Sequence, residues 1–142
     1  MAQLRHFAIV VRDQERSAKF YEQAFGLKRV GFEDLGWSSA VYMSDGTVNL
    51  ALLHFTGTKG SGRDDMTNFV GAHHFGFIVD DAAETQKRVE AAGGTFFMDL
   101  GDNAEKENFE RKFRELVDAV EEELKTSASG AKLQRAELMV VK

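Results

Sequence analysis

The sequence predicts an α+β fold, a single domain over residues 1–142 that is made of two repeated β-α-β-β-β modules. The main observation is a repeat: residues 5–13 (RHFAIVVRD) return 68 positions later (74 − 6) as residues 73–81 (HHFGFIVDD). Each copy alternates like a strand and then changes to helical periodicity. A chain of 142 residues also has the size of one compact domain. Because an internal repeat sets the architecture, we expect two similar modules that share a core.

The first module begins with a strand and a helix that local signals define well. Residues 4–11 alternate as a strand does, which places His6 at its beginning. Asp13 is suited to cap a helix over residues 14–25, and Gly26 stands where a helix C-terminal glycine is expected. Three strand-like stretches complete the module, at residues 27–33, 37–43 and 47–55.

The second module follows a linker. Module one covers about residues 1–56, a glycine-rich linker covers 57–72, and module two covers about 73–142. Module two repeats the pattern, and we expect its strands and helix at residues 73–79, 81–92 and 95–99.

Beyond residue 100 the repeat is lost. Apolar side chains recur at helical spacing and predict an additional C-terminal helix, through Phe109, Phe113, Leu116, Val120 and Leu124. Residues 109–113 fit a short strand equally well, which would leave the helix to about 114–126. Periodicity leaves both alternatives open.

Composition limits the partners and the compartment. A net charge of −5 argues against a nucleic-acid surface, and no stretch is long and apolar enough to span a membrane. The absence of cysteine excludes disulfides and thiolate zinc sites. The chain begins directly with a strand-like pattern, so we expect no signal peptide. We therefore expect a cytoplasmic protein with no nucleic-acid and no membrane partner.

A strand-helix unit with a histidine in its first strand, repeated at His6 and His74, resembles the vicinal oxygen chelate superfamily. Its members include glyoxalase I, extradiol dioxygenases, fosfomycin-modifying enzymes and bleomycin-resistance proteins. The resemblance extends over residues 4–100 and is poor over about 114–130. It implies that the modules form a half-barrel sheet whose concave face holds one divalent metal, with ligands from the first and last strands of each module. Members with two modules often complete their sites across subunits, so we expect a homodimer.

Carried over to this chain, the resemblance gives His6, His74 and Glu137 as metal ligands. The last strand of module one should add a carboxylate, but Leu50 or Ala51 occupies that position, depending on a one-residue register. A set of two histidines and one carboxylate leaves open positions on a metal, which suits Fe, Mn, Ni or Zn as the divalent ion.

Other residues near this site are assigned by strand alternation. His73 is expected to face away from His74, so that both cannot bind one metal. His54 would face the metal only if Leu50, and not Ala51, occupies the carboxylate position. The catalytic residue stays unknown, since no side chain stands out as a general base. The pocket is expected to be lined by Trp37, Tyr42 and Asn49.

The function that these residues favour is a metal-dependent enzyme acting on a small molecule that chelates the metal through adjacent oxygens. The alternative is a metal-free protein that binds or sequesters a small molecule, as bleomycin-resistance proteins do, and the missing carboxylate favours it. In a third reading, His6 and His74 are polar residues at strand starts whose hydrogen bonds are satisfied by backbone or water.

Overall fold

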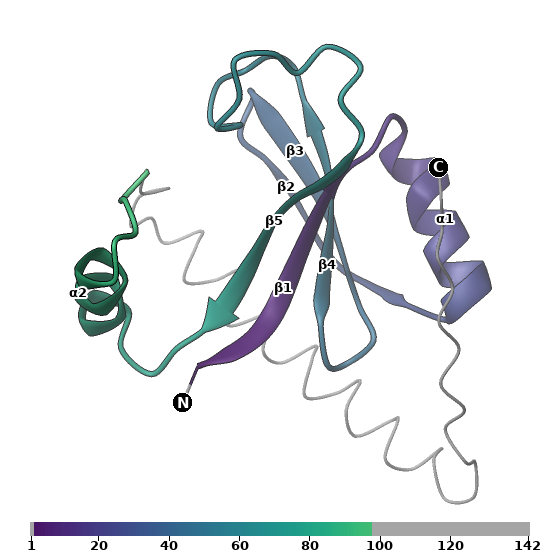
Figure 1. The fold of residues 1–142 in the computed structure, drawn as a ribbon. Coiled ribbons are helices and arrows are strands. Elements are labelled where there is room, and N and C mark those ends of the chain that lie inside the picture. The colour runs from purple at the N-terminus through teal and green to yellow at the C-terminus, as the bar shows by residue number, and fades with distance from the viewer. Residues whose placement is uncertain (1, 98–142) are drawn as a thin grey trace, which may run out of the picture.

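The structure, a computed structural model, describes residues 2–97 and contains five strands and two helices in that range (Figure 1). In chain order the elements are β1 Gln3–Val10, α1 Gln14–Phe25, β2 Lys28–Asp34, β3 Ser38–Ser44, β4 Asn49–Phe55, β5 Gly71–Ile78 and α2 Ala82–Ala91. The α+β class is confirmed, and the ends of these elements agree with the predicted ends to within two residues.

The five strands form one mixed sheet in the order β2-β3-β4-β1-β5. β1 runs parallel to β4 and antiparallel to β5, so the two copies of the repeated segment pair directly with each other. Phe7 lies opposite its own repeat equivalent, Phe75. His6 lies opposite Gly76, and His74 lies opposite Ala8, which are equivalent pairs under the repeat. The β1–β5 ladder is therefore locally two-fold symmetric about the Phe7–Phe75 pair.

Side-chain and backbone caps fix both ends of α1. Asp13 has extended backbone, and its Oδ1 accepts a hydrogen bond of 2.9 Å from the N–H of Arg16. Gly26 adopts the left-handed conformation at φ 72°, and its N–H donates to the carbonyl of Glu22 at 3.0 Å. The same cap starts α2, where Asp81 Oδ1 accepts from Glu84 N–H at 2.9 Å. Both predicted caps of α1 are confirmed.

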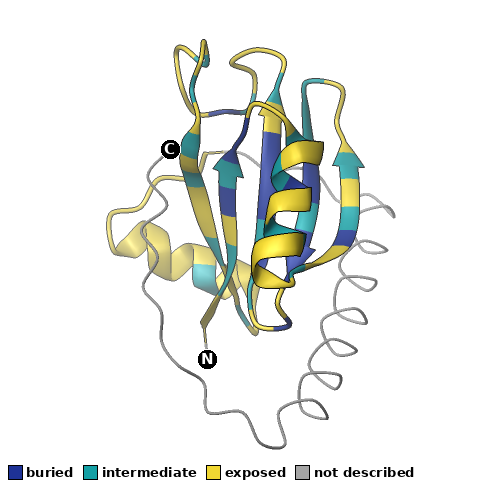
Figure 2. Cartoon of the chain, turned by 90° about the vertical axis from the view of Figure 1, so that its right-hand side faces the viewer, coloured by how far each residue is buried: buried dark blue, intermediate teal, exposed yellow. Residues whose placement is uncertain are grey.

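Two apolar clusters stabilise the two faces of the sheet. The first lies under α1, where the buried strand residues are visible behind the helix in Figure 2, and consists of Val11, Ala18, Val41, Met43 and Leu52. The second lies on the opposite face and consists of Ala8, Val10, Ala40, Ala51 and Leu53. We call this the histidine face, because strand alternation places His6 on the same side of β1 as Ala8 and Val10. The fold thus separates a helix-covered face from the histidine face.

The glycine-rich segment after β4 packs over the histidine face. Met66 and Phe69 contact its apolar cluster. Ser61 is buried, and its Oγ donates to the carbonyl of Thr58 at 2.8 Å. Gly60, at φ +69°, lies so close to the ring of Trp37 that a Cβ would overlap it. This linker is therefore part of the packed structure in the described range.

Two predictions beyond α2 have a different outcome. A strand is expected at residues 95–99, but residues 95–97 do not form one, so the prediction is wrong for these three residues. Residues 98–99 lie outside the described range. The C-terminal helix and Glu137 lie outside the described residues. Across residues 2–97, no helix has the length and apolarity that crossing a membrane requires.

Candidate functional site

The two repeated histidines come together on the histidine face. The Nε2 atoms of His6 and His74 are 3.2 Å apart, and their ring centroids are 5.1 Å apart. The ladder explains this, because His6 pairs with Gly76 and His74 pairs with Ala8, which places the imidazoles diagonally across adjacent strands. The β1–β5 register thus brings the two repeat-equivalent histidines side by side.

A glycine opposite His6 makes room for this approach. A Cβ built on Gly76 would lie 3.2 Å from the Cβ of His6 and 3.5 Å from its Cδ2. Such a contact is tight, so any larger residue at this position would press on the imidazole. Gly76 therefore determines how closely the ring of His6 can lie against β5.

The prediction for His73 is wrong. Its Nδ1 lies 2.7 Å from the Nδ1 of His74, whereas strict alternation would place the two rings on opposite faces. The reason is a β-bulge: Ala8 pairs with His74 and Ile9 pairs with Ala72, so His73 has no partner on β1. A bulge inserts one residue and redirects its side chain. Nothing in the sequence period signals it.

Hydrogen bonds extend from His74 through His73 into the linker. The Nε2 of His73 lies 2.9 Å from the carbonyl oxygen of Ser61. Its ring also stacks on Phe55, with centroids 5.1 Å apart and an interplanar angle of 29°. The order of contacts is therefore His6, His74, His73 and the Ser61 carbonyl, which ties the site to the packed linker.

The environment keeps the two repeated histidines neutral. Burial, and secondarily the nearby His74, lowers the pKa of His6 from 6.5 to about 4. Burial followed by the effect of His73 lowers the pKa of His74. A neutral imidazole has a free lone pair on one nitrogen, which is the form that binds metal ions.

The structure shows that Ala51, and not Leu50, lies on the histidine face. Leu50 packs against the helix-side cluster, whereas Ala51 belongs to the cluster of the histidine face. Ala51 pairs with Ala8, next to the histidines. His54 shares the alternation of Leu50 and is exposed, so it faces away from His6 and His74.

Asn49 lies beside His6 on this face. The two residues pair directly in the parallel β1–β4 register. Asn49 is 5% exposed, and its Oδ1 is buried without a hydrogen-bond partner in the described part of the chain. An unsatisfied buried acceptor costs about 1–3 kcal/mol, and such atoms usually have a water, ligand or ion as partner.

A carboxylate that the sequence did not reveal shares the histidine face. Tyr42 lies 6.5 Å from His6 between ring centroids, and its hydroxyl donates to Glu33 Oε2 at 2.8 Å. Burial, followed by this hydrogen bond, raises the pKa of Tyr42, so the hydroxyl stays protonated and donates. Glu33 pairs with Ala40, a member of the histidine-face cluster. The β2–β3 register, which the sequence alone leaves open, was the information needed to find it.

The spacing of the two nitrogens fits a shared metal ion. Two metal–nitrogen bonds of about 2.1 Å that meet at about 100° place the nitrogens about 3.2 Å apart, as His6 and His74 are here. Among residues 2–97 no group of three His, Cys, Asp or Glu side chains completes a site. The described residues therefore offer two of the three predicted ligands, while Glu137 lies outside the range.

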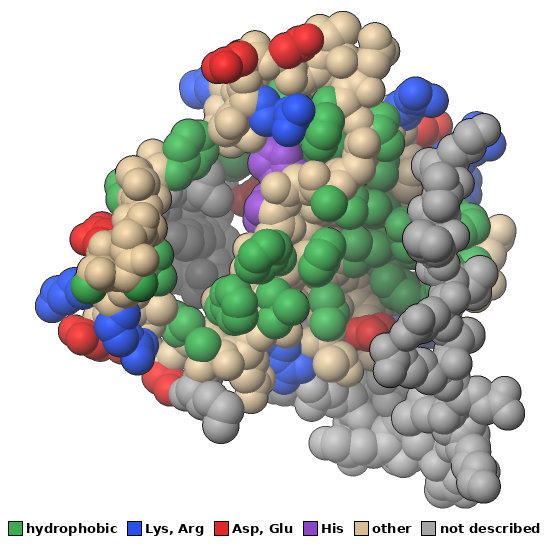
Figure 3. All heavy atoms as spheres, viewed as in Figure 1, with side chains coloured by type: hydrophobic (Ala, Val, Ile, Leu, Met, Phe, Trp, Pro, Cys, Tyr) green, Lys and Arg blue, Asp and Glu red, His purple; other side chains and the backbone are tan. Residues whose placement is uncertain are grey.

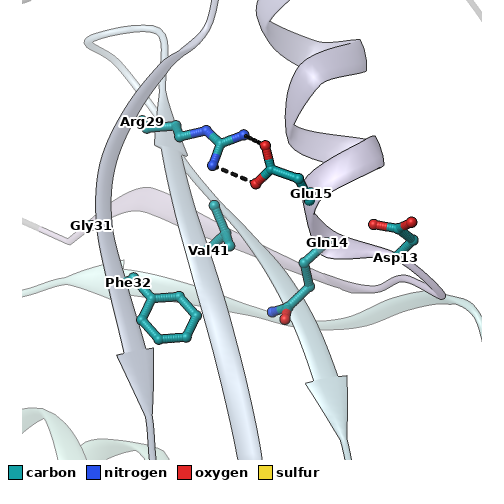
Figure 4. A pocket seen from close by; sticks show the side chains of 7 residues that line it. All are labelled: Asp13, Gln14, Glu15, Arg29, Gly31, Phe32 and Val41. Carbon is teal, nitrogen blue, oxygen red and sulfur yellow. Dashed lines mark hydrogen bonds and ion pairs between the residues drawn. The ribbon is translucent and has the colours of Figure 1, made fainter.

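A separate pocket lies on the helix-covered side of the sheet (Figure 4). Its lining residues are Asp13, Gln14, Glu15, Arg29, Gly31, Phe32 and Val41. Both terminal nitrogens of Arg29 donate to Glu15 at 2.8 Å, and its Nε donates to Glu22 at 2.8 Å. The pocket's guanidinium is thus already neutralised, so we place the candidate site at the histidines, where His74 is exposed and His6 and His73 are partly exposed. Histidine side chains are visible at the surface of the face shown in Figure 3.

Comparison with known proteins agrees with the fold. A methylmalonyl-CoA epimerase in complex with methylmalonyl-CoA and NH4+ superposes with a TM-score of 0.59 at 20% identity, covering 73% of this chain and 78% of that one. A single-residue variant of the Streptomyces coelicolor methylmalonyl-CoA epimerase, in complex with 2-nitronate-propionyl-CoA, gives 0.58 at 21% identity, covering 72% and 77%. A hypothetical protein from Bacillus halodurans C-125 gives 0.56 at 23% identity, covering 65% and 69%.

At these identities the structural likeness establishes the fold alone. No curated protein sequence matches the chain. The family model of the Glyoxalase/Bleomycin resistance protein/Dioxygenase superfamily matches residues 3–116, which is most of the chain. The paired strand-helix repeats and the superposed structures agree with that match. The chain belongs to the Glyoxalase/Bleomycin resistance protein/Dioxygenase superfamily.

Proposed function

We propose that this protein is a metal-dependent enzyme that acts on a small molecule which chelates the metal through adjacent oxygens. The observation that carries the proposal is the 3.2 Å separation of the Nε2 atoms of His6 and His74. Two neutral imidazoles at this spacing, at a surface reachable from solvent, supply two of the three ligands of the proposed open metal site. Membership of the superfamily supports the same interpretation.

Each residue has a distinct role in this proposal. His6 and His74 hold the cation through Nε2, and Glu137 is the proposed third ligand. A divalent ion there supplies Lewis-acid chemistry, stabilising negative charge on the substrate's oxygens. Asn49 offers an unsatisfied oxygen on the side of His6 where a carboxylate is missing, and it can accept a hydrogen bond from the bound molecule.

Glu33 is our candidate for the general base. A base of this kind must lie near the reacting atoms and be held in position. The hydroxyl of Tyr42 donates to Glu33 at 2.8 Å, and the ring of Tyr42 lies 6.5 Å from that of His6 between centroids. Glu33 would accept a proton from a carbon beside the chelating oxygens, and Tyr42 would fix the orientation of the carboxylate.

The substrate class to test first is a coenzyme A thioester. The support is that the superposed methylmalonyl-CoA epimerases contain methylmalonyl-CoA or 2-nitronate-propionyl-CoA. A thioester with a second carbonyl group two bonds away also presents two oxygens at chelating distance. Small diketones and hydroxy acids are suitable comparison substrates, because they also present two chelating oxygens but lack the nucleotide of coenzyme A.

Calorimetric titration with Mn(II), Fe(II), Ni(II) and Zn(II) tests the metal site. We expect one site per chain in the wild type and a loss of at least about tenfold in affinity for His74→Ala, because one of two imidazole ligands is removed. His54→Ala, at an exposed histidine on the other face, is the matched control and should bind like the wild type. No binding by the wild type at micromolar metal would refute the proposal.

A second candidate function rests on a separate observation. Ala51 occupies the carboxylate position of module one, and with Ala8, Val10 and Leu53 it makes an apolar floor beside the histidines. Such a floor suits a metal-free protein that binds a small apolar molecule. Thermal shift measurements with candidate ligands separate the two functions, since stabilisation that persists in excess chelator supports the metal-free protein and argues against the enzyme.

A further inference from the structure

The bulged His73 has no role in the site as described so far, yet both of its ring nitrogens are engaged. Its Nε2 faces the Ser61 carbonyl at 2.9 Å, and its Nδ1 faces the Nδ1 of His74 at 2.7 Å. With both nitrogens in hydrogen bonds, His73 has none left to bind a metal. Any effect of His73 on a bound metal must therefore be transmitted through its hydrogen bond to His74.

The direction of these hydrogen bonds follows from the chemistry of the partners. A carbonyl oxygen can only accept, so the Nε2 of His73 carries the hydrogen that meets Ser61. In a neutral imidazole the other nitrogen is then an acceptor. The Nδ1 of His73 accordingly accepts, and the Nδ1–H of His74 donates to it. In neutral His74 this leaves the Nε2 as the lone-pair nitrogen, directed at the Nε2 of His6.

We infer that His73 is a positioning residue that holds His74 in the Nδ1–H tautomer, so that its Nε2 lone pair, which accepts from His6 Nε2–H in the metal-free protein, is the atom available to a cation. The inference deepens the proposed metal site and rests on it. Metal-binding histidines commonly donate their second N–H to an acceptor that fixes tautomer and ring orientation. Here a neighbouring imidazole is that acceptor, and the bulge in β5 brings it onto the same face.

The packing around His73 supports a fixed acceptor. Its ring stacks on Phe55 at 5.1 Å between centroids, which restricts rotation. The accepting carbonyl belongs to Ser61, which is 5% exposed and is held by hydrogen bonds of its Oγ within the linker. Because the His73 ring is held by Phe55 and by the Ser61 carbonyl, its Nδ1 stays directed at His74 when solvent or substrate enters the site.

The first histidine of the pair lacks such a partner in its own strand. Under the repeat, the position of His73 corresponds to Arg5, which is likewise skipped in the β1–β5 register. Arg5 donates from Nη1 to the carbonyl of Thr47 at 2.7 Å. A guanidinium has no acceptor to offer, so it cannot fix the tautomer of His6 in this manner. The two ligands are therefore unequal.

Nitrogen-15 NMR of histidine-labelled protein, free of metal, tests the inference directly on the wild type. Ring-nitrogen shifts and couplings distinguish the two tautomers, and we expect His74 to be the Nδ1–H form. An Nε2–H tautomer at His74 in the folded wild type would overturn the inference. This result does not depend on metal binding, so it is separable from the test of the proposed function.

Two variants of His73 extend the test. His73→Phe keeps a ring to stack on Phe55 but removes the acceptor, and we expect His74 to lose its tautomer preference and metal affinity to fall about 10–100-fold. His73→Asn replaces the Nδ1 acceptor with an amide oxygen, and should restore the tautomer and most of the affinity. His54→Phe is the matched control at a histidine outside the cluster.

The outcomes separate the two claims. If the wild type binds metal and His73→Phe binds it equally well with an unchanged His74 tautomer, the positioning role is refuted while the metal site stands. If the wild type binds no metal but shows the Nδ1–H tautomer that His73→Phe loses, the hydrogen-bond role stands and the metal proposal fails. Thermal melting of each variant identifies changes that come from misfolding.

Discussion

Acidification should destabilise the metal-free protein through His6. Burial, and secondarily His74, lowers the pKa of His6 from 6.5 to about 4 in the folded state. The unfolded chain takes up a proton near pH 6.5, whereas the folded chain resists it until about pH 4. The stability that His6 contributes is therefore fully present above pH 6.5 and is lost as the pH falls to about 4.

The size of the effect follows from the shift. A difference of 2.5 units (6.5 − 4) corresponds to at most ~3.4 kcal/mol. Because His6 is only partly buried, water screens the effect, and we expect about 1–2 kcal/mol. Urea unfolding at pH 7.5 and pH 4.0, with chelator present, measures it as the difference between the wild type and His6→Asn.

Comparing the two proteins removes the contribution of other acidic and basic groups, which titrate in both. The wild type should lose about 1–2 kcal/mol more unfolding free energy than His6→Asn over this pH range. His54→Asn removes an exposed histidine and should behave like the wild type. An equal loss in the wild type and His6→Asn would show that His6 is not held neutral by its surroundings, and would refute the argument.

Two glycines give further predictions. Gly60→Ala should lower the unfolding free energy by about 2–4 kcal/mol, since its left-handed backbone disfavours a side chain and its Cβ would overlap Trp37. Gly36→Ala is the control, because Gly36 also has a left-handed backbone (φ +78°) but has open space around it, so only the backbone cost applies. If chemical denaturation shows the same loss of unfolding free energy for both variants, the overlap with Trp37 makes no contribution and this reasoning is wrong. Gly76→Ala should weaken metal binding in calorimetry by displacing His6, and an unchanged affinity would show that the strand yields instead.

Local signals explain what the sequence predicted well. Asp13 and Gly26 marked both ends of α1 because a side-chain cap and a left-handed glycine each act within one turn. The repeated segment placed His6 and His74 at equivalent positions of two strands, since equivalent sequences form equivalent strands. These predictions needed no knowledge of how distant segments pair.

What could not be predicted depends on pairing between strands. Alternation assigned His73 to the wrong face, because a bulge is visible only in the ladder with β1. The choice between Leu50 and Ala51 needed the β1–β4 register, and the place of Glu33 needed the β2–β3 register. A shift of one residue exchanges the faces of a strand, so these positions stayed open until the sheet was known.

The two-fold symmetry of the β1–β5 ladder has a consequence for how such a chain can arise. Phe7 lies opposite Phe75 on the local axis, with ring centroids 6.4 Å apart, and the axis relates His6 to His74. Two separate copies of a single module, meeting along β1, would bring the same two imidazoles together. A half-length ancestor could thus have held a shared ligand as a pair of identical chains. Joining the two copies in one chain would let each half change alone, as the difference between Arg5 and His73 at equivalent positions illustrates.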